Sequence, residues 1–369
     1  MAESSVPDLL EQVAEAFDRK DYRSATQVLK ELWKQQPGNP QVQLYRGRLY
    51  EVAGKLDQAR DTYKHLLKAV PTPKLMAQAR QGIERVDQLD REQRQREIAR
   101  SIAAPNQDQQ GLLILEAIAQ TDRPAAAQAL SKIMAIDGYS ARLQLPNRGW
   151  RIYRMGPIGE MALYGQQLRS SKIPAFWVTE ESLHQPKLVQ VNHVIQTGNH
   201  PKVSGTCAGD AIEIDWNGSD VTSSAQGSSP IFDRALEFDP LRREYSSRAR
   251  KETVKDYAVF FDLHLKSRNL ILRFCDRTYD FQSGVRWESG DRLERTGLRS
   301  QWNHILQWFK PVMDSKPFWN DFAPFSDTAT DFVHLLKAID PGFYLYGQEE
   351  SRINAAFHLY SLLAFHRAT

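Results

Sequence analysis

The sequence has few cysteines, no long apolar run and little excess of either charge. Its two cysteines, Cys207 and Cys275, are too few among 369 residues for a disulfide framework, which fits a reducing compartment. The longest apolar runs, such as AVFFDLHL, are much shorter than the roughly 20 residues of a membrane-spanning helix. The N-terminal residues MAESSVPDLLEQ have neither the basic nor the apolar segment of a secretory signal. These absences predict a cytoplasmic protein with no transmembrane segment.

Motifs for catalysis and metal binding are also lacking. The sequence contains no phosphate-binding loop, no nucleophile elbow and no cysteine or histidine spacing typical of zinc sites. Asp262, His264 and Cys275 fall on neighbouring predicted strands, with Cys207 near a third, but such residues on half-buried strands are usually structural. Strand alternation places Asp262 and His264 on one face, where they could form an ion pair. We therefore expect a non-catalytic protein with no metal and no cofactor.

A repeated helical pattern near the N-terminus is the most specific feature of the sequence. Its period is 34 residues, and four positions recur: Ala25, Leu29, Leu32 and Pro37, then Ala59, Tyr63, Leu66 and Pro71. Small residues such as Gly47 and Ala59 allow two helices to approach closely, and an aromatic side chain fills the space beside them. The pattern predicts helix pairs over about 6–36 and 39–70, followed by a capping helix that begins near Pro73.

With these residues the N-terminal segment resembles the tetratricopeptide repeat (TPR) family. The second copy, from Pro40 to Pro71, has the family's Gly, Tyr, Ala, Tyr and Pro positions, whereas the first has Val13 and Ala16 where Gly and Tyr are expected. The resemblance implies a surface that binds another protein and is lined by the first helix of each pair. By position, that partner-binding groove would contain Leu10, Phe17, Gln41, Leu44, Arg48 and Glu51.

The residues at these groove positions indicate which kind of partner the repeats could bind. The family's carboxylate clamp for chaperone C-termini requires Lys and Asn, but Leu10 and Ala14 occupy the corresponding positions of the first repeat. Leu10, Phe17 and Leu44 would suit an apolar helix or an extended peptide instead. The alternative is that two repeats form too short a groove and pack on the following domain.

Residues 111–180 are predicted to form a β-α-β-β-α-β domain of the ferredoxin-like class. The predicted strands are 111–118, 140–146, 149–156 and 173–179, and the predicted helices are 121–137 and 157–172. The run from Trp150 through Met155-Gly156-Pro157 to Ile173–Val178 resembles a SPOR domain. SPOR domains typically bind denuded glycan strands of peptidoglycan, but we carry over the fold and not that ligand.

Residues 183–315 are predicted to form an antiparallel β domain. Six segments alternate or run apolar: 188–196, 211–216, 230–239, 256–265, 269–276 and 278–284. Hairpin turns that connect neighbouring strands are expected at 205–209, 217–218 and 267–269. A helix rich in aromatic residues follows, with Trp302, Ile305, Leu306 and Phe309 on one face. Several antiparallel strands closed by one such helix resemble a pleckstrin-homology-like barrel, here over residues 185–313. The remaining residues, 316–369, are expected to be helices packed on this domain.

Two basic segments are candidates for binding anions. The first is a candidate patch for an anionic partner surface and contains Arg242, Arg243, Arg248, Arg250 and Lys251. The second places Arg148, Arg151 and Arg154 beside two aromatic residues, a pattern that could stack bases or sugars. We favour the simpler explanation for each segment: a solvated loop for the first and the exposed face of an ordinary sheet for the second.

Together these patterns predict an α+β multidomain protein. The expected parts are a TPR-like helical domain (1–98), a linker (99–110), a ferredoxin-like domain (111–180), a β domain (183–315) and C-terminal helices (316–369). The predicted function is that of a protein-interaction adaptor or assembly factor that binds one or more proteins. One alternative is a ligand-binding or enzymatic β domain targeted by the repeats. Another is binding of nucleic acid or an anionic surface, and the net charge of +3 gives it little support.

Overall fold

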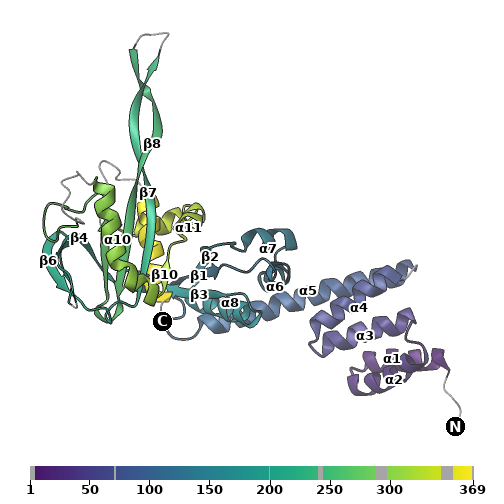
Figure 1. Ribbon diagram of the computed structural model, residues 1–369. Coiled ribbons are helices and arrows are strands. Elements are labelled where there is room, and N and C mark those ends of the chain that lie inside the picture. The colour runs from purple at the N-terminus through teal and green to yellow at the C-terminus, as the bar shows by residue number, and fades with distance from the viewer. Residues whose placement is uncertain are drawn as a thin grey trace. The chain divides into compact units, whose positions relative to one another are not determined.

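The computed structural model describes residues 5–69, 72–198, 200–239, 244–287, 297–341 and 352–367, with the backbone alone over 232–239 and 244–255. The chain forms two compact units, Met1–Arg100 and Ser101–Thr369 (Figure 1). The division between them falls within the predicted linker at 99–110. None of the helices in the described ranges is long and apolar enough to cross a membrane.

The N-terminal unit consists of the predicted helices. Their bounds are α1 Val6–Asp18, α2 Tyr22–Gln35, α3 Pro40–Val52, α4 Leu56–Ala69 and α5 Pro73–Ile102. Polar side chains cap the N-termini: Ser5 and Asp8 form a reciprocal capping box at α1, and the Asp21 carboxylate accepts a hydrogen bond from the Ser24 N–H at α2. α1 packs against α2 and α3 against α4, so the two predicted hairpins are confirmed.

Tyr63 of α4 is the central packing residue of the second hairpin. Its ring lies between Gly47 of α3 and Gly82 of α5, and it is fully buried. A Cβ atom added at Gly47 would overlap the ring, and one added at Gly82 would lie 2.6 Å from it. The two glycines therefore allow α3 and α5 to pack against opposite edges of one aromatic ring. The sequence pattern identified Gly47 and did not identify Gly82.

The C-terminal unit begins with a small antiparallel sheet. Among the described residues this sheet has three strands in the order β2-β1-β3, with bounds β1 Gln110–Glu116, β2 Trp150–Pro157 and β3 Ala175–Thr179. The helices that accompany it are α6 Arg123–Met134, α7 Gly138–Gln144, α8 Ile158–Ser170 and α9 Glu180–Leu183. The order is therefore β1-α6-α7-β2-α8-β3-α9.

The prediction of a strand at 140–146 is wrong, because this segment lies in and just after helix α7. The Asp137 carboxylate accepts a hydrogen bond from the Ser140 N–H at 2.9 Å and caps the helix. The buried residues are Ala141 and Leu145, four positions apart, whereas Leu143 is 59% exposed. This is helical and not strand spacing, so the described domain lacks the second strand of the ferredoxin-like pattern.

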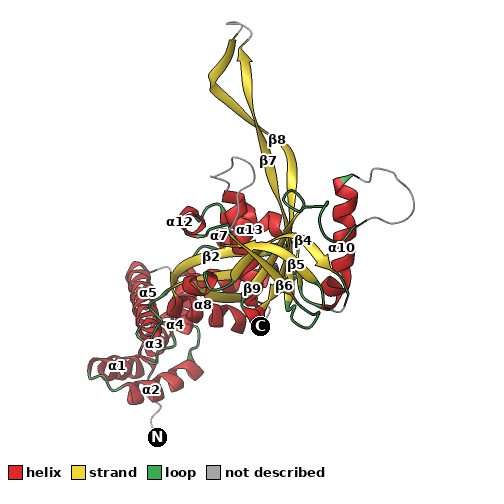
Figure 2. Cartoon of the chain, turned by 90° about the vertical axis from the view of Figure 1, so that its left-hand side faces the viewer, coloured by secondary structure: helices red, strands yellow, loops and turns green. Residues whose placement is uncertain are grey.

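A larger sheet follows in the same unit. Among the described residues it has seven strands in the order β10-β7-β8-β9-β4-β5-β6. The bounds are β4 Lys187–Gln196, β5 Lys202–Cys207, β6 Asp210–Asp215, β7 Ser223–Asp239, β8 Glu244–Leu265, β9 Leu270–Cys275 and β10 Phe318–Trp319. β7 and β8 are the longest strands, and their hairpin projects beyond the rest of the unit (Figure 2).

Three details of the predicted β domain are wrong. Over the described residues the sheet is open, with β10 and β6 at its edges, and the pairs β4·β9 and β10·β7 are parallel, so it is not an antiparallel barrel. Residues 278–284 form turns and not a strand. Asn217 closes a turn by accepting hydrogen bonds from the Ser219 and Asp220 N–H groups, and the strands on either side of that turn are not paired with each other.

Two other hairpins are where the sequence placed them. Ala208 and Gly209 connect β5 to β6 with φ angles of 50° and 94°, as a tight hairpin turn requires. The segment of Lys266–Arg268 (η1) and Asn269, whose φ is 51°, connects β8 to β9. The sequence analysis identified both turns but did not identify β5 as a strand.

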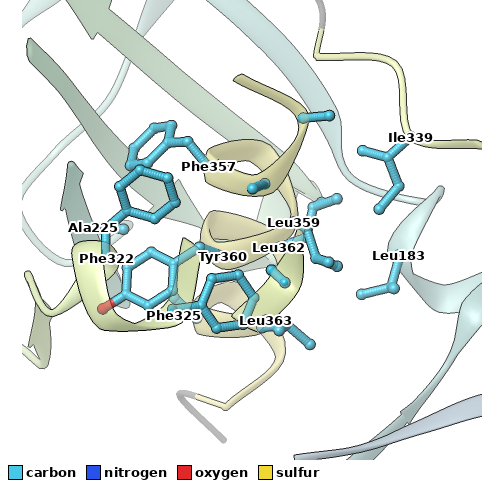
Figure 3. Packing of buried hydrophobic residues seen from close by; sticks show 14 of the residues in the cluster. Leu183, Ala225, Phe322, Phe325, Ile339, Phe357, Leu359, Tyr360, Leu362 and Leu363 are labelled. Atoms are coloured by element: carbon cyan, nitrogen blue, oxygen red, sulfur yellow. The ribbon is translucent and has the colours of Figure 1, made fainter. Parts of the chain in front are cut away.

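The C-terminal helices complete this unit. Their bounds are α10 Leu298–Ser315, α11 Phe322–Ala329, α12 Val333–Ala338 and α13 Arg352–Arg367. Every residue of α13 from 354 to 365 is buried, which is typical of a helix enclosed on all sides. Figure 3 shows Tyr360 and Phe357 of α13 among the side chains of this core.

α13 packs on both sheets. The ring centroid of Tyr360 lies 5.2 Å from that of Trp150 in β2, and Phe357 stacks on Phe260 of β8 at 5.0 Å. One continuous hydrophobic cluster therefore contains residues from the predicted segments 111–180, 183–315 and 316–369. This shared core explains why residues 101–369 form one compact unit.

Candidate functional site

The residues expected to line a TPR groove occupy varied environments. On α1, Leu10 and Phe17 are half-buried, and the Phe17 ring lies 5.3 Å from that of Tyr45. On α3, Gln41 is exposed, Leu44 is buried in the core with Tyr63, and the Arg48 guanidinium lies 5.6 Å from the centroid of the Tyr45 ring. Of these residues, Gln41 and Arg48 present polar groups near solvent.

Glu51 links three helices. Its carboxylate accepts a hydrogen bond from the Tyr63 hydroxyl of α4 and two from the Arg85 guanidinium of α5, both at 3.0 Å. Burial, followed by the hydrogen bond to Glu51, raises the pKa of Tyr63, and the hydrogen bond to Glu51 raises the pKa of Arg85. Glu51 thus holds the second hairpin to α5. A role in partner binding for the six predicted groove residues stays a prediction.

A groove is present between α2 and α3, and we call it the α2–α3 groove. Its volume is about 670 Å³. From α2 it is lined by Tyr22, Thr26, Leu29, Lys30, Trp33 and Lys34. From α3 and the turn after it, the lining is Arg46, Leu49, Tyr50, Val52, Ala53 and Lys55. Val52 is 49% exposed, so the groove carries accessible apolar surface.

Arg46 organises the floor of the α2–α3 groove. Its guanidinium carbon lies 4.1 Å from the centroid of the Trp33 ring and 5.3 Å from that of the Tyr50 ring. Its Nε–H donates a hydrogen bond to the Tyr50 hydroxyl at 3.0 Å. These contacts fix a cation against two aromatic faces. The floor therefore combines apolar area with a charge held in one place.

The rim of the α2–α3 groove is basic. Lys30 and Lys34 are exposed on one side, four residues apart on α2, and Lys55 is exposed in the turn after α3. None of the described residues that line the groove is acidic. Together with Arg46, four cations thus surround an apolar floor, an arrangement that can bind an anionic group beside an apolar one.

The α2–α3 groove was missed because the prediction used the other face of α3. A helix turns by about 100° per residue, so Arg46, Leu49, Tyr50 and Ala53 centre on the face opposite Gln41, Leu44, Arg48 and Glu51. The signals in the sequence were the pair Lys30 and Lys34 at i,i+4 beside Trp33. Whether those residues faced solvent together with α3 depended on how the two helices cross.

The second predicted basic patch forms intramolecular contacts. Arg148 pairs with Asp321 at 3.1 Å, and Arg154 pairs with Glu160 at 3.4 Å. Arg151 donates a hydrogen bond to the Leu143 carbonyl at 3.2 Å. This surface is therefore a set of ion pairs and hydrogen bonds around β2, as expected of an ordinary sheet.

The first predicted basic patch falls on the projecting hairpin. Arg242 and Arg243 lie outside the described residues. Arg248, Arg250 and Lys251 belong to β8, where the backbone alone is described. Lys251 is in register with Ala235 of β7, and Arg250 with Leu236. Binding of an anionic surface by this patch stays a prediction.

The charged residues inside the C-terminal unit pair differently from the prediction. Asp262 accepts hydrogen bonds from Arg273 of β9 at 2.7 and 2.9 Å, and not from His264. Both side chains are at most 1% exposed. Arg273 also donates to the Pro341 carbonyl and contacts Nδ1 of His358, each at 3.2 Å. This network joins β8 and β9 to α13.

His264 has hydroxyl partners. Its Nδ1 lies 2.7 Å from the Ser223 Oγ, and its Nε2 lies 3.0 Å from the Ser361 Oγ. Burial, followed by the charge of Arg273, lowers the pKa of His264 to about 3, so the ring is neutral at physiological pH. Burial likewise raises the pKa of the Cys275 thiol to about 11. These groups are enclosed and serve packing.

A cavity of about 820 Å³ lies beside β8 and the first turns of α10. Three of its four described charged lining residues are paired with one another: Arg277 binds Asp256, and its Nε lies 3.8 Å from the Asp276 carboxylate. Phe260 and Leu263 of β8 and Ile271 of β9 are buried in the hydrophobic core and do not line this cavity. No group of three or more potential metal ligands occurs in the part of the chain that the structure describes.

Comparison with known proteins gives one match, to the N-terminal unit. Residues 16–83 match the family model described as tetratricopeptide repeat. This range covers the end of α1, the whole of α2, α3 and α4, and the first part of α5. No curated protein and no solved structure matches the chain. The N-terminal helical hairpins are tetratricopeptide repeats, and the resemblances of 111–179 and 185–313 to other families stay predictions.

Proposed function

We propose, from the tetratricopeptide repeats of the N-terminal unit, that this protein is a non-catalytic adaptor that binds a segment of another protein in the α2–α3 groove. The observation that carries the proposal is the open apolar floor of Trp33, Leu49 and Tyr50 between two repeat helices. Interface centres are enriched in tryptophan, tyrosine and arginine, and Trp33, Tyr50 and Arg46 supply all three.

The C-terminal unit would then bind a second protein, so that the chain connects two partners. Its buried charges are used within the fold, since Asp262, Arg273 and His358 form one network. In the cavity beside β8, Arg277 pairs with Asp256 and Asp276, which leaves Arg299 as the fourth charged residue of the described lining. These observations favour an assembly or regulatory factor over an enzyme, and that role rests on the general use of such repeats.

A pair of matched substitutions tests the proposal. Thr26 lies in the α2–α3 groove and Thr62 lies outside it on α4, and each hydroxyl donates to the carbonyl four residues earlier, at 2.6 and 2.7 Å. Thr26→Tyr should fill the groove, whereas Thr62→Tyr adds the same bulk elsewhere. Proteins bound to the full-length chain in extracts of its native cells would be identified by mass spectrometry after cross-linking.

We expect Thr26→Tyr to lose at least one specific partner that the wild type and Thr62→Tyr retain. The same partner retained by all three proteins would contradict a site in the α2–α3 groove. Arg48→Glu then examines the first-helix face predicted from the family, because Arg48 is on the opposite side of α3. Loss of the partner with Arg48→Glu alone would move the site to that face.

A further inference from the structure

We propose that the α2–α3 groove selects an acidic protein segment that carries an aromatic or branched aliphatic side chain. This inference rests on the proposed function, because it names the chemistry of the partner that would bind there. It follows from three features of the groove: its apolar floor, the sign of the charges around it and its length.

The apolar floor requires an apolar anchor. Leu29 is buried at its base, and the rings of Trp33 and Tyr50 belong to it. The volume of about 670 Å³ lies in the range of about 300–1,000 Å³ typical of ligand pockets. A purely polar segment would leave this surface in contact with water or with unpaired polar groups, so one large apolar side chain is needed to fill it.

The charges around the floor require anionic groups beside that anchor. Lys30 and Lys34 project from α2, and Lys55 follows α3. The Arg46 guanidinium is held over Trp33 with its Nε–H on Tyr50. That hydrogen bond uses Nε, and an arginine fork fixed in this way is suited to a carboxylate. With four cations and no acidic residue among the described lining, a basic segment would be repelled.

The length of the groove sets the size of the segment. From Tyr22 to Trp33 the groove follows α2 over eleven residue steps, or about 16 Å at 1.5 Å per residue. An extended chain covers that distance in about five residues at 3.3 Å each. We therefore expect a short motif with one apolar residue flanked by aspartate or glutamate.

Defined peptides test this chemistry with the full-length protein. The probes are three fluorescent ten-residue pools: Asp and Glu around a central Phe, Leu or Trp; the same pool with a central Ser; and a pool with Lys in place of the acids. Anisotropy measures binding at low and at moderate salt. We expect the acidic apolar pool to bind at least about tenfold more tightly than either of the others and to weaken as salt rises.

Charge reversal supplies the matched variants. Lys30→Glu with Lys34→Glu reverses two exposed cations four residues apart on α2, and Lys64→Glu with Lys68→Glu makes the same change on α4, outside the groove. We expect the α2 variant to weaken binding of the acidic apolar pool by about tenfold or more, and the α4 variant to stay within about twofold of wild type.

Several results would overturn the inference. If the central-Ser pool bound as tightly as the acidic apolar pool, the floor would not select an apolar side chain. If both charge reversals weakened binding of the acidic apolar pool equally, the peptides would be attracted by net charge alone. Displacement by a single-stranded DNA oligonucleotide at equal concentration would assign the cations to nucleic acid. If no acidic apolar peptide binds while Thr26→Tyr still loses its protein partner, the partner chemistry is wrong and the proposed function stands. If Thr26→Tyr changes nothing in either assay, both fail.

Discussion

The buried ion pair between Asp262 and Arg273 provides the sharpest prediction about stability. Asp262 is fully buried, and its carboxylate receives three hydrogen-bond contacts from Arg273, between 2.7 and 3.2 Å. Replacing Asp262 with alanine leaves the Arg273 guanidinium in the core, where its described hydrogen-bond acceptors are the Pro341 carbonyl and Nδ1 of His358. The guanidinium would then lose the Asp262 carboxylate that pairs with it at 2.7 Å.

The desolvation of the remaining charge sets the expected loss in the free energy of unfolding. Removing one partner of a buried pair destabilises a protein by about 3–5 kcal/mol, because the remaining charge keeps its desolvation penalty. Replacing both partners with apolar residues of similar size is often close to neutral. We therefore expect Asp262→Ala to reduce the free energy of unfolding strongly, and Asp262→Leu with Arg273→Met to recover most of that loss.

Chemical denaturation of the full-length protein measures the effect. The matched control is Asp321→Ala, because Asp321 forms an ion pair with Arg148 whose side chains are 36% and 77% exposed. Exposed pairs contribute about 0–1 kcal/mol. The transition of the C-terminal unit should shift markedly for Asp262→Ala and little for the control.

Two results would refute this reasoning. If Asp262→Ala shifted the transition no more than Asp321→Ala, the buried pair would not be the electrostatic link between β8 and β9. If the apolar double variant were as unstable as the single one, the loss would come from packing and not from an uncompensated charge.

Three further predictions use other parts of the fold. Gly82→Ala should lower the free energy of unfolding of the N-terminal unit, because overpacking against Tyr63 costs about 1–3 kcal/mol and exceeds the gain of about 1 kcal/mol in helix propensity. Faster amide hydrogen exchange in α4 and α5 would confirm this, and slower exchange would contradict it. His264 has a pKa lowered to about 3 by burial, so its contribution to stability should fall by about 1.4 kcal/mol per pH unit as pH drops below about 6.5, because the unfolded state then binds a proton that the native state excludes. His264→Asn should show a shallower fall between pH 7.5 and 5, and an unchanged slope would exclude His264 as its source. At pH 8, Cys207 should be alkylated well before Cys275, whose thiol is buried with its pKa raised to about 11, and equal rates would show that β9 opens readily.

The repeats could be predicted because their signal is local. Gly47, Ala59 and Tyr63 are at fixed spacings within one hairpin, and Tyr63 contacts Gly47 inside that hairpin. The same spacing rule identified the aromatic face of α10, where Trp302, Ile305 and Phe309 are buried.

The prediction of a strand at 140–146 was wrong because the local pattern there is ambiguous. A short segment with alternating apolar residues fits either a strand or a helix, and the cap at Asp137 decided for α7.

The α2–α3 groove could not be predicted from the sequence, for a different reason. Lys30, Trp33, Arg46 and Tyr50 are separated in sequence, and the α2–α3 groove exists because α2 and α3 cross so that these side chains face solvent together. Spacing along one helix tells which residues share a face but not whether a second helix covers that face. The residues chosen on α3 from the family pattern were on the opposite face, where Glu51 binds Tyr63 and Arg85.

The amino-acid sequence by itself determined the helical repeats, the mixed α and β composition and the position of most strands, because these depend on spacing and on turn residues within short segments. The tertiary structure alone decided that the large sheet is open, that Asp262 pairs with Arg273, and that α13 packs on both sheets. It also decided that four cations surround one apolar groove. Each of these facts depends on contacts between residues far apart in the chain, and such contacts follow from how whole elements pack and not from any local pattern.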